Sequence, residues 1–210
     1  WGGISNSMQQ LLNLFFGIFL ARLLTPDDYG MVGMLTIFSL IAGTIQESGF
    51  IPALINKKDI KHEDYNAVFW FSILTSLCLY TLLFFCAPLI ADFYNDPVLL
   101  PLSRYLFLGF FISSWGTVQR AYLFIHLMNK ESCIIALTSL ILSNTAGLVM
   151  VLNGYSYWGL ATQNILFILI VAVMNWWYSP WRPTLHIDLR PVWRMFGFSS
   201  KLLLTNIVNT

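Results

Sequence analysis

Four stretches without a charged residue constrain this 210-residue chain more than any other feature. They cover residues 1–21, 29–46, 65–91 and 132–181, and about 20 apolar residues are enough for a helix to cross the ~30 Å hydrocarbon core of a bilayer. The composition agrees, since 57% of the residues are hydrophobic and 10% are charged, whereas a soluble domain has roughly 25% charged residues. The chain is therefore predicted to lie largely in a membrane, which argues against a soluble enzyme domain.

Breaks in the apolar pattern divide the chain into segments of membrane-crossing length. Because backbone polar groups in hydrocarbon must be bonded internally, these segments should be helices, and the ten-residue alternation of a membrane barrel is absent. Turn-forming residues separate the segments at 25–28, 95–97 and 153–154. The predicted fold is an all-α membrane protein, a six-transmembrane-helix bundle, with crossings at Gly2–Leu24, Gly30–Ile51, Ala67–Ile90, Leu99–Ile125, Ser132–Leu152 and Trp158–Trp177.

The basic residues of the loops predict the orientation of this bundle. Cytoplasmic loops of membrane proteins carry an excess of Lys and Arg. Here the loops on one side carry all the basic loop residues, whereas the loops on the other side carry aspartates, with Arg22 and Arg104 only at helix ends. The N-terminus is therefore predicted to be cytoplasmic, on the side that holds Lys57, Lys58, Lys61, Lys130, Arg182, Arg190 and Arg194.

The last 32 residues predict a further structural unit. Residues 179–195 mix apolar side chains with three arginines, which is typical of a linker lying at the cytoplasmic interface. Residues 196–210 are apolar but too short to cross, and their opening resembles the start of the chain. We expect residues 1–178 to form one lobe and residues 196–210 to begin a seventh helix in a second lobe, as in transporters built from repeats. The chain is then a piece of a longer protein.

Polar residues inside the predicted helices form stripes, and two interpretations of them remain open. On the first helix Asn6, Gln10, Asn13 and Gly17 share one face, and on the second Gly33, Thr36, Gly43, Thr44 and Glu47 do the same. Such residues either pack helices together or line a hydrophilic cavity. On the fifth predicted helix, packing is favoured for the row Ser139, Ser143 and Gly147.

Four charged residues lie within or at the ends of crossings, where each has an energetic cost. Arg22 lies about 160° from Asn6 around its helix and is expected to reach the outer interface instead. Glu47 and Arg120 both fall near the cytoplasmic ends of antiparallel helices, so they could form an ion pair or a headgroup site. Arg104 shares a broad face with Trp115 and Gln119 and could meet a phosphate.

Several other functions are excluded or disfavoured by the sequence. The net charge of +1 offers no basic face for nucleic acid. Cys78, Cys86 and Cys133 lie in apolar runs and are expected to behave as small hydrophobes. No zinc-protease, nucleophile-elbow, P-loop or dinucleotide motif occurs. We therefore predict no catalytic residues, no cofactor and no metal.

A set of short motifs, in order along the chain, resembles one known family. The motifs are Leu20-Ala21-Arg22-Leu23-Leu24-Thr25-Pro26-Asp27-Asp28-Tyr29-Gly30, Glu47-Ser48-Gly49-Phe50, Ile90-Ala91-Asp92-Phe93-Tyr94, Arg104, Trp158-Gly159-Leu160 and Phe196-Gly197-Phe198. Together they resemble Wzx-type polysaccharide transporters of the multidrug/oligosaccharidyl-lipid/polysaccharide superfamily. The resemblance implies two six-helix lobes in a protein about twice this length, of which this chain would be the N-terminal lobe.

The resemblance also implies a function. Such proteins move undecaprenyl-pyrophosphate-linked oligosaccharides across the bacterial inner membrane for O-antigen, capsule or exopolysaccharide assembly, by alternating access between two lobes. Lipid-linked oligosaccharide, membrane lipids and other polysaccharide-assembly proteins are the implied partners. Arg104 and Arg120 would hold the pyrophosphate, with Glu47, Asn13, Gln10, Thr36 and Gln119 as further cavity candidates. Two alternatives remain open, a multidrug or cation exporter of the same superfamily and a membrane glycan polymerase or ligase.

Overall fold

The computed structural model describes residues 2–47, 54, 60–185 and 190. Within these residues the chain folds into long α-helices and contains no β-strand. The prediction of an all-α fold is thereby confirmed. The helices are α1 (Gly2–Leu23), α2 (Pro26–Glu47), α4 (His62–Tyr94), α5 (Leu99–Ile125), α6 (Asn129–Leu152) and α7 (Ser156–Tyr178).

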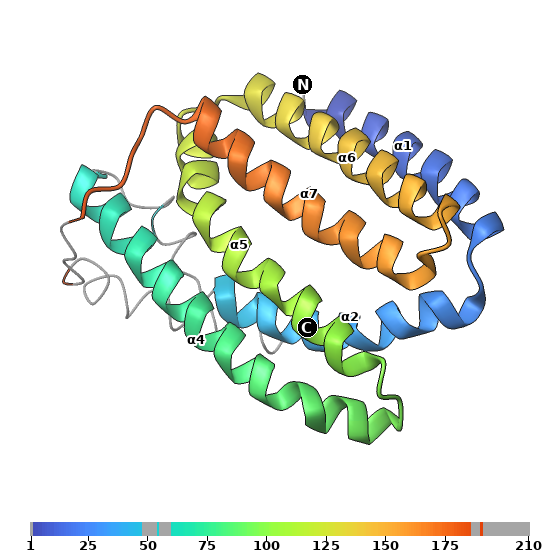
Figure 1. Ribbon diagram of the computed structural model, residues 1–210. Coiled ribbons are helices and arrows are strands. Elements are labelled where there is room, and N and C mark those ends of the chain that lie inside the picture. Colours follow the sequence, from blue (N-terminus) through green and yellow to red (C-terminus); the bar gives the residue numbers. More distant parts are fainter. Residues whose placement is uncertain (1, 48–53, 55–59, 186–189, 191–210) are drawn as a thin grey trace.

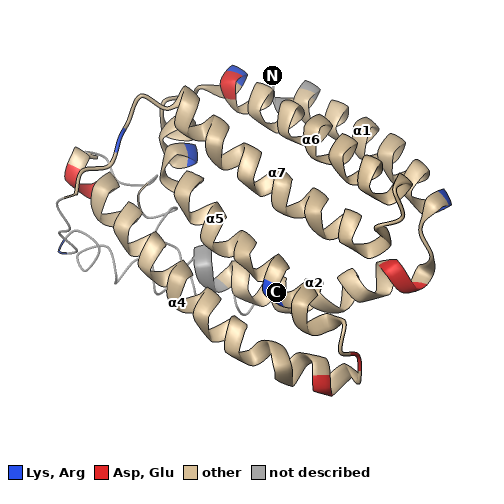
Figure 2. Ribbon diagram, viewed as in Figure 1, with Lys and Arg blue, Asp and Glu red and all other residues tan. Residues whose placement is uncertain are grey.

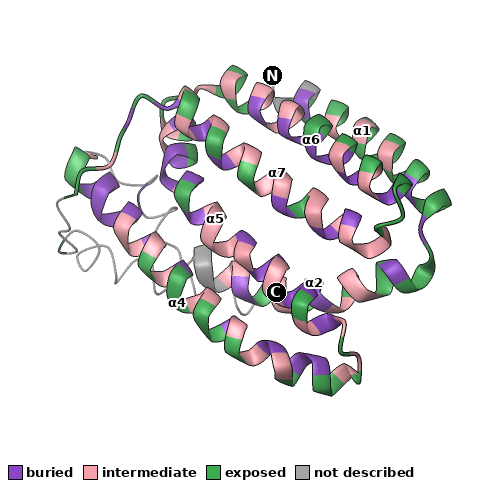
Figure 3. Ribbon diagram, viewed as in Figure 1, coloured by how far each residue is buried: buried purple, intermediate pink, exposed green. Residues whose placement is uncertain are grey.

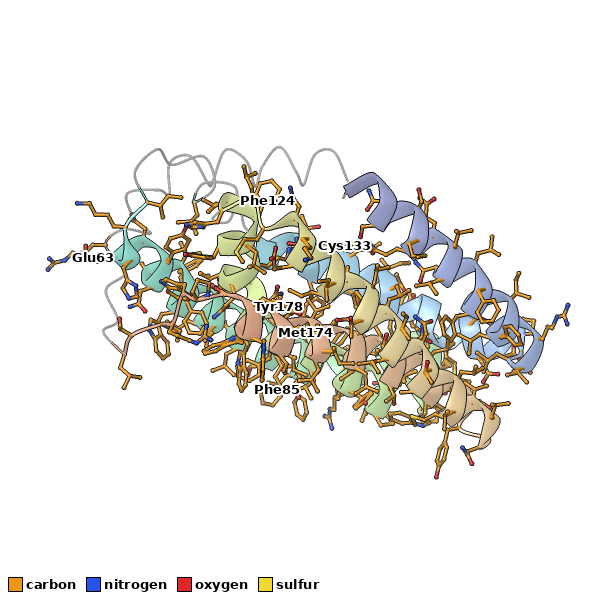
Figure 4. All side chains as sticks on the ribbon, turned by 90° about the horizontal axis from the view of Figure 1, so that it is seen from above. Glu63, Phe85, Phe124, Cys133, Met174 and Tyr178 are labelled. Atoms are coloured by element: carbon orange, nitrogen blue, oxygen red, sulfur yellow. The ribbon has the colours of Figure 1, made fainter. Side chains whose placement is uncertain are left out.

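Three of these helices, α4, α6 and α7, are long and apolar enough to cross a membrane. Their outer surfaces carry large apolar side chains, of which Phe85 is 73% and Leu89 68% exposed, and Phe85 lies at the edge of the bundle in Figure 4. Extended apolar surface of this kind is stable when it faces lipid. The chain is thus part of a multi-pass membrane protein. The predicted start of a seventh helix at 196–210 lies outside the described residues.

Helix α2 begins four residues before the predicted crossing, and residues 25–28, predicted as a turn, form its N-terminus. The Thr25 backbone N–H and hydroxyl both donate to Asp28 Oδ2, at 2.9 and 2.7 Å, and the Asp28 backbone N–H donates to Thr25 Oγ1 at 3.3 Å. This is a capping box with Thr25 as N-cap. Pro26 occupies the first helical position, where a backbone N–H would have no partner within the helix, so the lack of one in proline has no cost.

Helix α4 extends beyond the predicted crossing Ala67–Ile90 at both ends because polar residues cap it. At its start the Asp64 carboxylate accepts the Lys61 backbone N–H at 3.0 Å. At its end Asn95 adopts a left-handed conformation with φ 53°, and the Asp96 N–H donates to the Ala91 carbonyl at 3.1 Å. The 33-residue helix therefore includes the interfacial residues that a hydropathy pattern leaves out.

The helices form a row with a second, sparser layer behind it. Figure 1 shows α4, α5, α7 and α6 side by side in that order, with α1 and α2 at the back, and Figure 4 shows the same from above. Close packing within the row depends on glycines: a Cβ on Gly116 of α5 would lie 2.8 Å from the Cα of Ala172 in α7. In the back layer α1 packs on α6, whereas α2 packs on α4, α5 and α7. This arrangement leaves space between α1 and α2.

Charged residues and buried residues follow the pattern expected of a membrane bundle. Figure 2 shows the charges gathered toward helix ends, with long uncharged stretches between them. Figure 3 shows buried positions where helices of the row meet, while α1 is mostly exposed. Fully buried apolar side chains such as Phe107, Leu102 and Leu99 of α5 form the centre of a core shared with α2 and α4.

The segment after α7 is fixed to the start of α4. Trp181 is buried against Tyr65 and Phe69, and its indole N–H donates to His62 Nδ1 at 3.1 Å. Three residues later the Thr184 N–H donates to Asn66 Oδ1 at 2.9 Å, and the Thr184 carbonyl accepts from the indole N–H of Trp70 at 2.8 Å. The described part of the predicted linker, residues 179–185, is therefore held against the bundle.

Candidate functional site: a polar cleft between the two layers

The space between the two layers is a cleft lined by both polar and apolar side chains. A cavity of about 550 Å³ lies among α1, α2, α6 and α7. A second cavity of about 200 Å³ lies among α2, α5 and α7, and the two share Val32, Thr36 and Asn164. We call the combined space the polar cleft. Its polar lining residues are Gln9, Asn13, Tyr29, Thr36, Ser39, Ser113, Ser143, Asn144, Gln163 and Asn164.

Helical periodicity explains how these residues come to one place. Gln9 and Asn13 are four residues apart on α1, and the same spacing separates Val32 from Thr36 on α2. Residues three and four apart lie on the same side of a helix. Each helix therefore brings polar side chains to the cleft, with apolar lining residues such as Val32 and Phe167 among them.

A hydrogen-bonded amide pair forms one wall of the cleft. Gln163 Nε2 of α7 donates to Asn144 Oδ1 of α6 at 2.8 Å, and Asn144 Nδ2 donates to the Leu140 carbonyl at 2.7 Å. Gln163 Oε1 is buried and has no hydrogen-bond partner among the described residues. A buried acceptor without a partner is energetically unfavourable, and this oxygen is packed against α6, where a Cβ on Gly147 would lie 3.0 Å from it.

The opposite wall presents side chains that are open to the cleft. Asn13 of α1 and Thr36 of α2 are both exposed, as is Asn164 of α7. The Thr36 hydroxyl donates to the Val32 carbonyl at 3.1 Å, which leaves its oxygen free to accept. The cleft thus offers both donors and acceptors.

The lining is neutral. Neither cavity has a Lys, Arg, Asp or Glu among its lining residues, and no group of three or more metal-ligating side chains occurs in the part of the chain that is described. Amides and hydroxyls hydrogen-bond to hydroxyl-rich molecules, and Tyr29 and Phe167 add aromatic surface. Chemically, the cleft suits an uncharged polar guest such as a sugar.

The predicted site residues are distributed over several places. Asn13 and Thr36 line the polar cleft. Gln10 is exposed on α1 outside the lining, where Gln9 takes the position facing the cleft. The side chain of Glu47 lies outside the described residues, so its predicted pairing with Arg120 remains a prediction.

Gln119 lies in the helix row instead of the cleft. It is fully buried. With its amide oriented to satisfy both neighbours, it donates to the Trp115 carbonyl at 2.8 Å and accepts from the Trp176 indole N–H at 3.3 Å. The structure therefore gives Gln119 a role in joining α5 to α7.

The two arginines of α5 lie on opposite sides of that helix. At 100° per residue Arg120 is about 20° from Ser113, which lines the cleft, whereas Arg104 is about 180° from it. Arg120 is exposed and about 10 Å further along the helix than Ser113. Arg104 packs against α4, with its guanidinium carbon 4.0 Å from the centre of the Phe84 ring.

Sequence reasoning missed the polar side chains of the last two helices. Asn144, Gln163 and Asn164 lie in the 50-residue uncharged stretch and line the cleft. Ser143 lines it too but is 1% exposed, and the row Ser139, Ser143 and Gly147 is buried or in close contact with α7, which agrees with the packing that the sequence favoured. Amides in an otherwise apolar run were a usable signal, because they are costly in hydrocarbon unless they are bonded or hydrated.

Comparison with known proteins identifies the family. A family model described as "Polysaccharide biosynthesis protein" matches residues 19–210. The chain belongs to this polysaccharide biosynthesis protein family. The match confirms, at the level of the family, the resemblance to Wzx-type transporters that the motifs indicated.

Curated relatives of the family cover the whole chain or nearly so. It is 26% identical to the lipopolysaccharide biosynthesis protein WzxC of Escherichia coli and 26% identical to the teichuronic acid biosynthesis protein TuaB of Bacillus subtilis, in both cases over 100% of this chain. It is 25% identical to the succinoglycan biosynthesis transport protein ExoT of Rhizobium meliloti over 90% of this chain. These matches span 43%, 44% and 38% of the relatives, so the chain corresponds to less than half their length. No solved structure matches the chain significantly.

Proposed function

We propose that the complete protein carries a lipid-linked oligosaccharide across the bacterial inner membrane during assembly of a surface polysaccharide. In this proposal the headgroup crosses within the polar cleft while its undecaprenyl tail stays in the bilayer. The protein acts as a carrier and not as an enzyme. The glycan is left open, because the names of the three relatives refer to three different polysaccharides.

The observation that carries the proposal is the neutral polar lining of the cleft. Sugars present many hydroxyl groups and few charges, so a wall of amides and hydroxyls replaces their hydration without imposing a charge. The exposed side chains of Thr36, Asn164 and Asn13 supply such groups from α2, α7 and α1. The surrounding apolar exterior, of which Phe85 and Leu89 are examples, suits the lipid tail.

The pyrophosphate requires a cation, and Arg120 is the candidate that the geometry favours. It is exposed and lies on the cleft side of α5, about two turns beyond Ser113. Guanidinium groups bind phosphate oxygens through paired hydrogen bonds. We propose that Arg120 holds the pyrophosphate at the cytoplasmic mouth of the cleft.

The proposed transport cycle needs a second lobe and a defined orientation. We propose that all six described helices cross the membrane with the N-terminus in the cytoplasm, as the distribution of basic loop residues predicts. Rocking of this lobe against the second would expose the cleft to each side in turn. The relatives, of which the chain spans less than half, have room for such a lobe.

A matched pair of threonine variants tests the proposal. Thr36 and Thr81 are both exposed, and each donates its hydroxyl to the carbonyl four residues before it, at 3.1 and 2.7 Å. Only Thr36 lines the cleft. In full-length protein reconstituted into vesicles, we expect Thr36→Val to slow translocation of labelled glycolipid about three- to tenfold, the loss of roughly one hydrogen bond, and Thr81→Val to leave it unchanged.

A second variant strengthens this test. Asn164→Leu removes an amide that borders both cavities, and we expect a loss of translocation at least as large. Equal rates for the wild-type protein, Thr36→Val and Asn164→Leu would show that the cargo does not pass through the polar cleft.

A further inference from the structure

Arg104 has unfilled hydrogen-bonding capacity on the surface that faces away from the polar cleft. Its Nε is buried and has no hydrogen-bond partner among the described residues. The Arg104 side chain also forms no ion pair with any of these residues. One face of the guanidinium is covered by the Phe84 ring at 4.0 Å. A guanidinium carries five N–H donors and is always charged. A cation held in this way is a binding position for an oxyanion.

The surroundings of Arg104 show which kind of anion could reach it. Phe111 and Trp115 lie on the same face of α5, two and three turns deeper, and their rings are in contact with centroids 5.8 Å apart. Trp115 is 49% exposed, and this face is about 180° from the cleft. A lipid lying here could place its phosphate on Arg104 and its acyl chains along these rings.

The depth of Arg104 agrees with a lipid phosphate. It is five residues into α5, about 7.5 Å from the start of the helix. The same end of the bundle carries Asp92 and Asp96 in the connection from α4 to α5. Long basic side chains at such positions extend to the headgroup region of the bilayer.

We propose that Arg104 and Phe84 bind the phosphate of a resident membrane phospholipid on the outer surface of the α4–α5 pair. Phe84 holds the guanidinium by a cation–π contact, and the phosphate oxygens accept from the terminal Nη groups, because the Nε itself is buried. The proposal rests on the membrane position of these helices. It concerns a lipid that stays bound, and is separate from the cargo path through the polar cleft.

Photolabelling tests the proposal in the full-length protein. The vesicles contain phosphatidylethanolamine and phosphatidylglycerol, with a trace of phosphatidylglycerol that carries a diazirine on one acyl chain. Labelled peptides are then mapped by mass spectrometry. We expect label on the α4 and α5 peptides that flank Arg104, and about tenfold less label in Arg104→Gln, the ratio expected for one charge-assisted contact.

Matched variants separate a specific site from general effects. Arg22→Gln removes an exposed arginine at the same end of the bundle and should leave the α4–α5 label unchanged. Phe84→Leu keeps the charge but removes the ring, and should also lower the label. Because it leaves Arg104 in place, it still tests the site if Arg104→Gln fails to fold.

Competition identifies the ligand. Raising the share of unlabelled phosphatidylglycerol in the vesicles should lower the label, whereas adding the same share of diacylglycerol with the same chains should not, because it lacks the phosphate. The proposal is overturned if Arg104→Gln labels like the wild-type protein, or if diacylglycerol competes equally well. Displacement of the label by undecaprenyl pyrophosphate alone would assign the site to the cargo. That result would overturn the proposal of a resident phospholipid, but it would not contradict the proposed transport function.

Discussion

Gly116 sets how closely α5 and α7 approach one another. A Cβ at this position would meet the Cα of Ala172 at 2.8 Å and its Cβ at 3.2 Å. Backbone atoms of a packed helix cannot move aside cheaply. Gly116→Ala is therefore expected to destabilise the lobe by about 1–3 kcal/mol, observed as a lower midpoint of thermal unfolding in detergent.

Gly17 provides the matched control for this prediction. It also lies within a helix, but nothing lies within 4 Å of the position that its Cβ would take. Gly17→Ala should therefore leave the unfolding midpoint unchanged or raise it slightly. Equal unfolding midpoints for Gly116→Ala and Gly17→Ala would contradict the close approach of α5 and α7.

Single residues were the hardest feature to predict from the sequence. Asn13 and Thr36 could be placed on polar strips because periodicity fixes positions around one helix. Which side of α5 faces the cleft depends on how α5 packs against its neighbours, and periodicity within one helix does not determine that. The resemblance grouped Arg104 with Arg120 as headgroup candidates, although 100° per residue separates them by about 160°. The structure adds that the cleft lies on the side of Arg120 and that Arg104 packs on α4.

At the scale of elements, the start of α2 depends on the Thr25 and Asp28 capping box. Asp28 is buried, and its carboxylate accepts both the backbone N–H and the hydroxyl of Thr25. We expect Asp28→Ala to cost about 1 kcal/mol of unfolding free energy. Asp27→Ala, at the exposed neighbouring position, is the control for the loss of charge, and its thermal unfolding should match that of the wild-type protein.

The segment after α7 contributes stability through Trp181. This side chain is buried against α4, whereas Trp177 is 83% exposed. Trp181→Ala should therefore cost about 3–5 kcal/mol, and Trp177→Ala should cost little in detergent. Comparable losses for the two variants would contradict the observed packing of residues 179–185 on α4.

Helix existence and order followed from the sequence because long apolar runs leave few alternatives in a membrane. The range Leu99–Ile125 was predicted to the residue for α5. Boundaries differed where local polar chemistry extends a helix into the interface, as the Thr25 capping box does for α2 and Asn95 for α4. The fixed segment after α7 was not foreseen, since its partners are more than 100 residues away in the sequence.

At the scale of the whole molecule, the proposed orientation places the two ends of α6 on opposite sides of the membrane. Asn129 begins this helix and Asn153 follows it, and both are exposed. In full-length protein with its cysteines replaced by alanine, Asn153→Cys should react with an impermeant maleimide added outside intact cells. Asn129→Cys should react only after the cells are opened, and the reverse pattern would invert the orientation.

The central claim is that the space between the two layers of helices is filled with water in the intact protein. The direct measurement is the rate at which a water-soluble thiol reagent modifies Thr36→Cys and Leu82→Cys in vesicles containing the full-length, otherwise cysteine-free protein. Both positions are exposed in the structure, but Thr36 lines the polar cleft and Leu82 lies on α4 outside it. We predict rapid modification at position 36 and none at position 82, whereas equally slow modification at both would mean that the cleft is sealed from water and cannot carry a sugar.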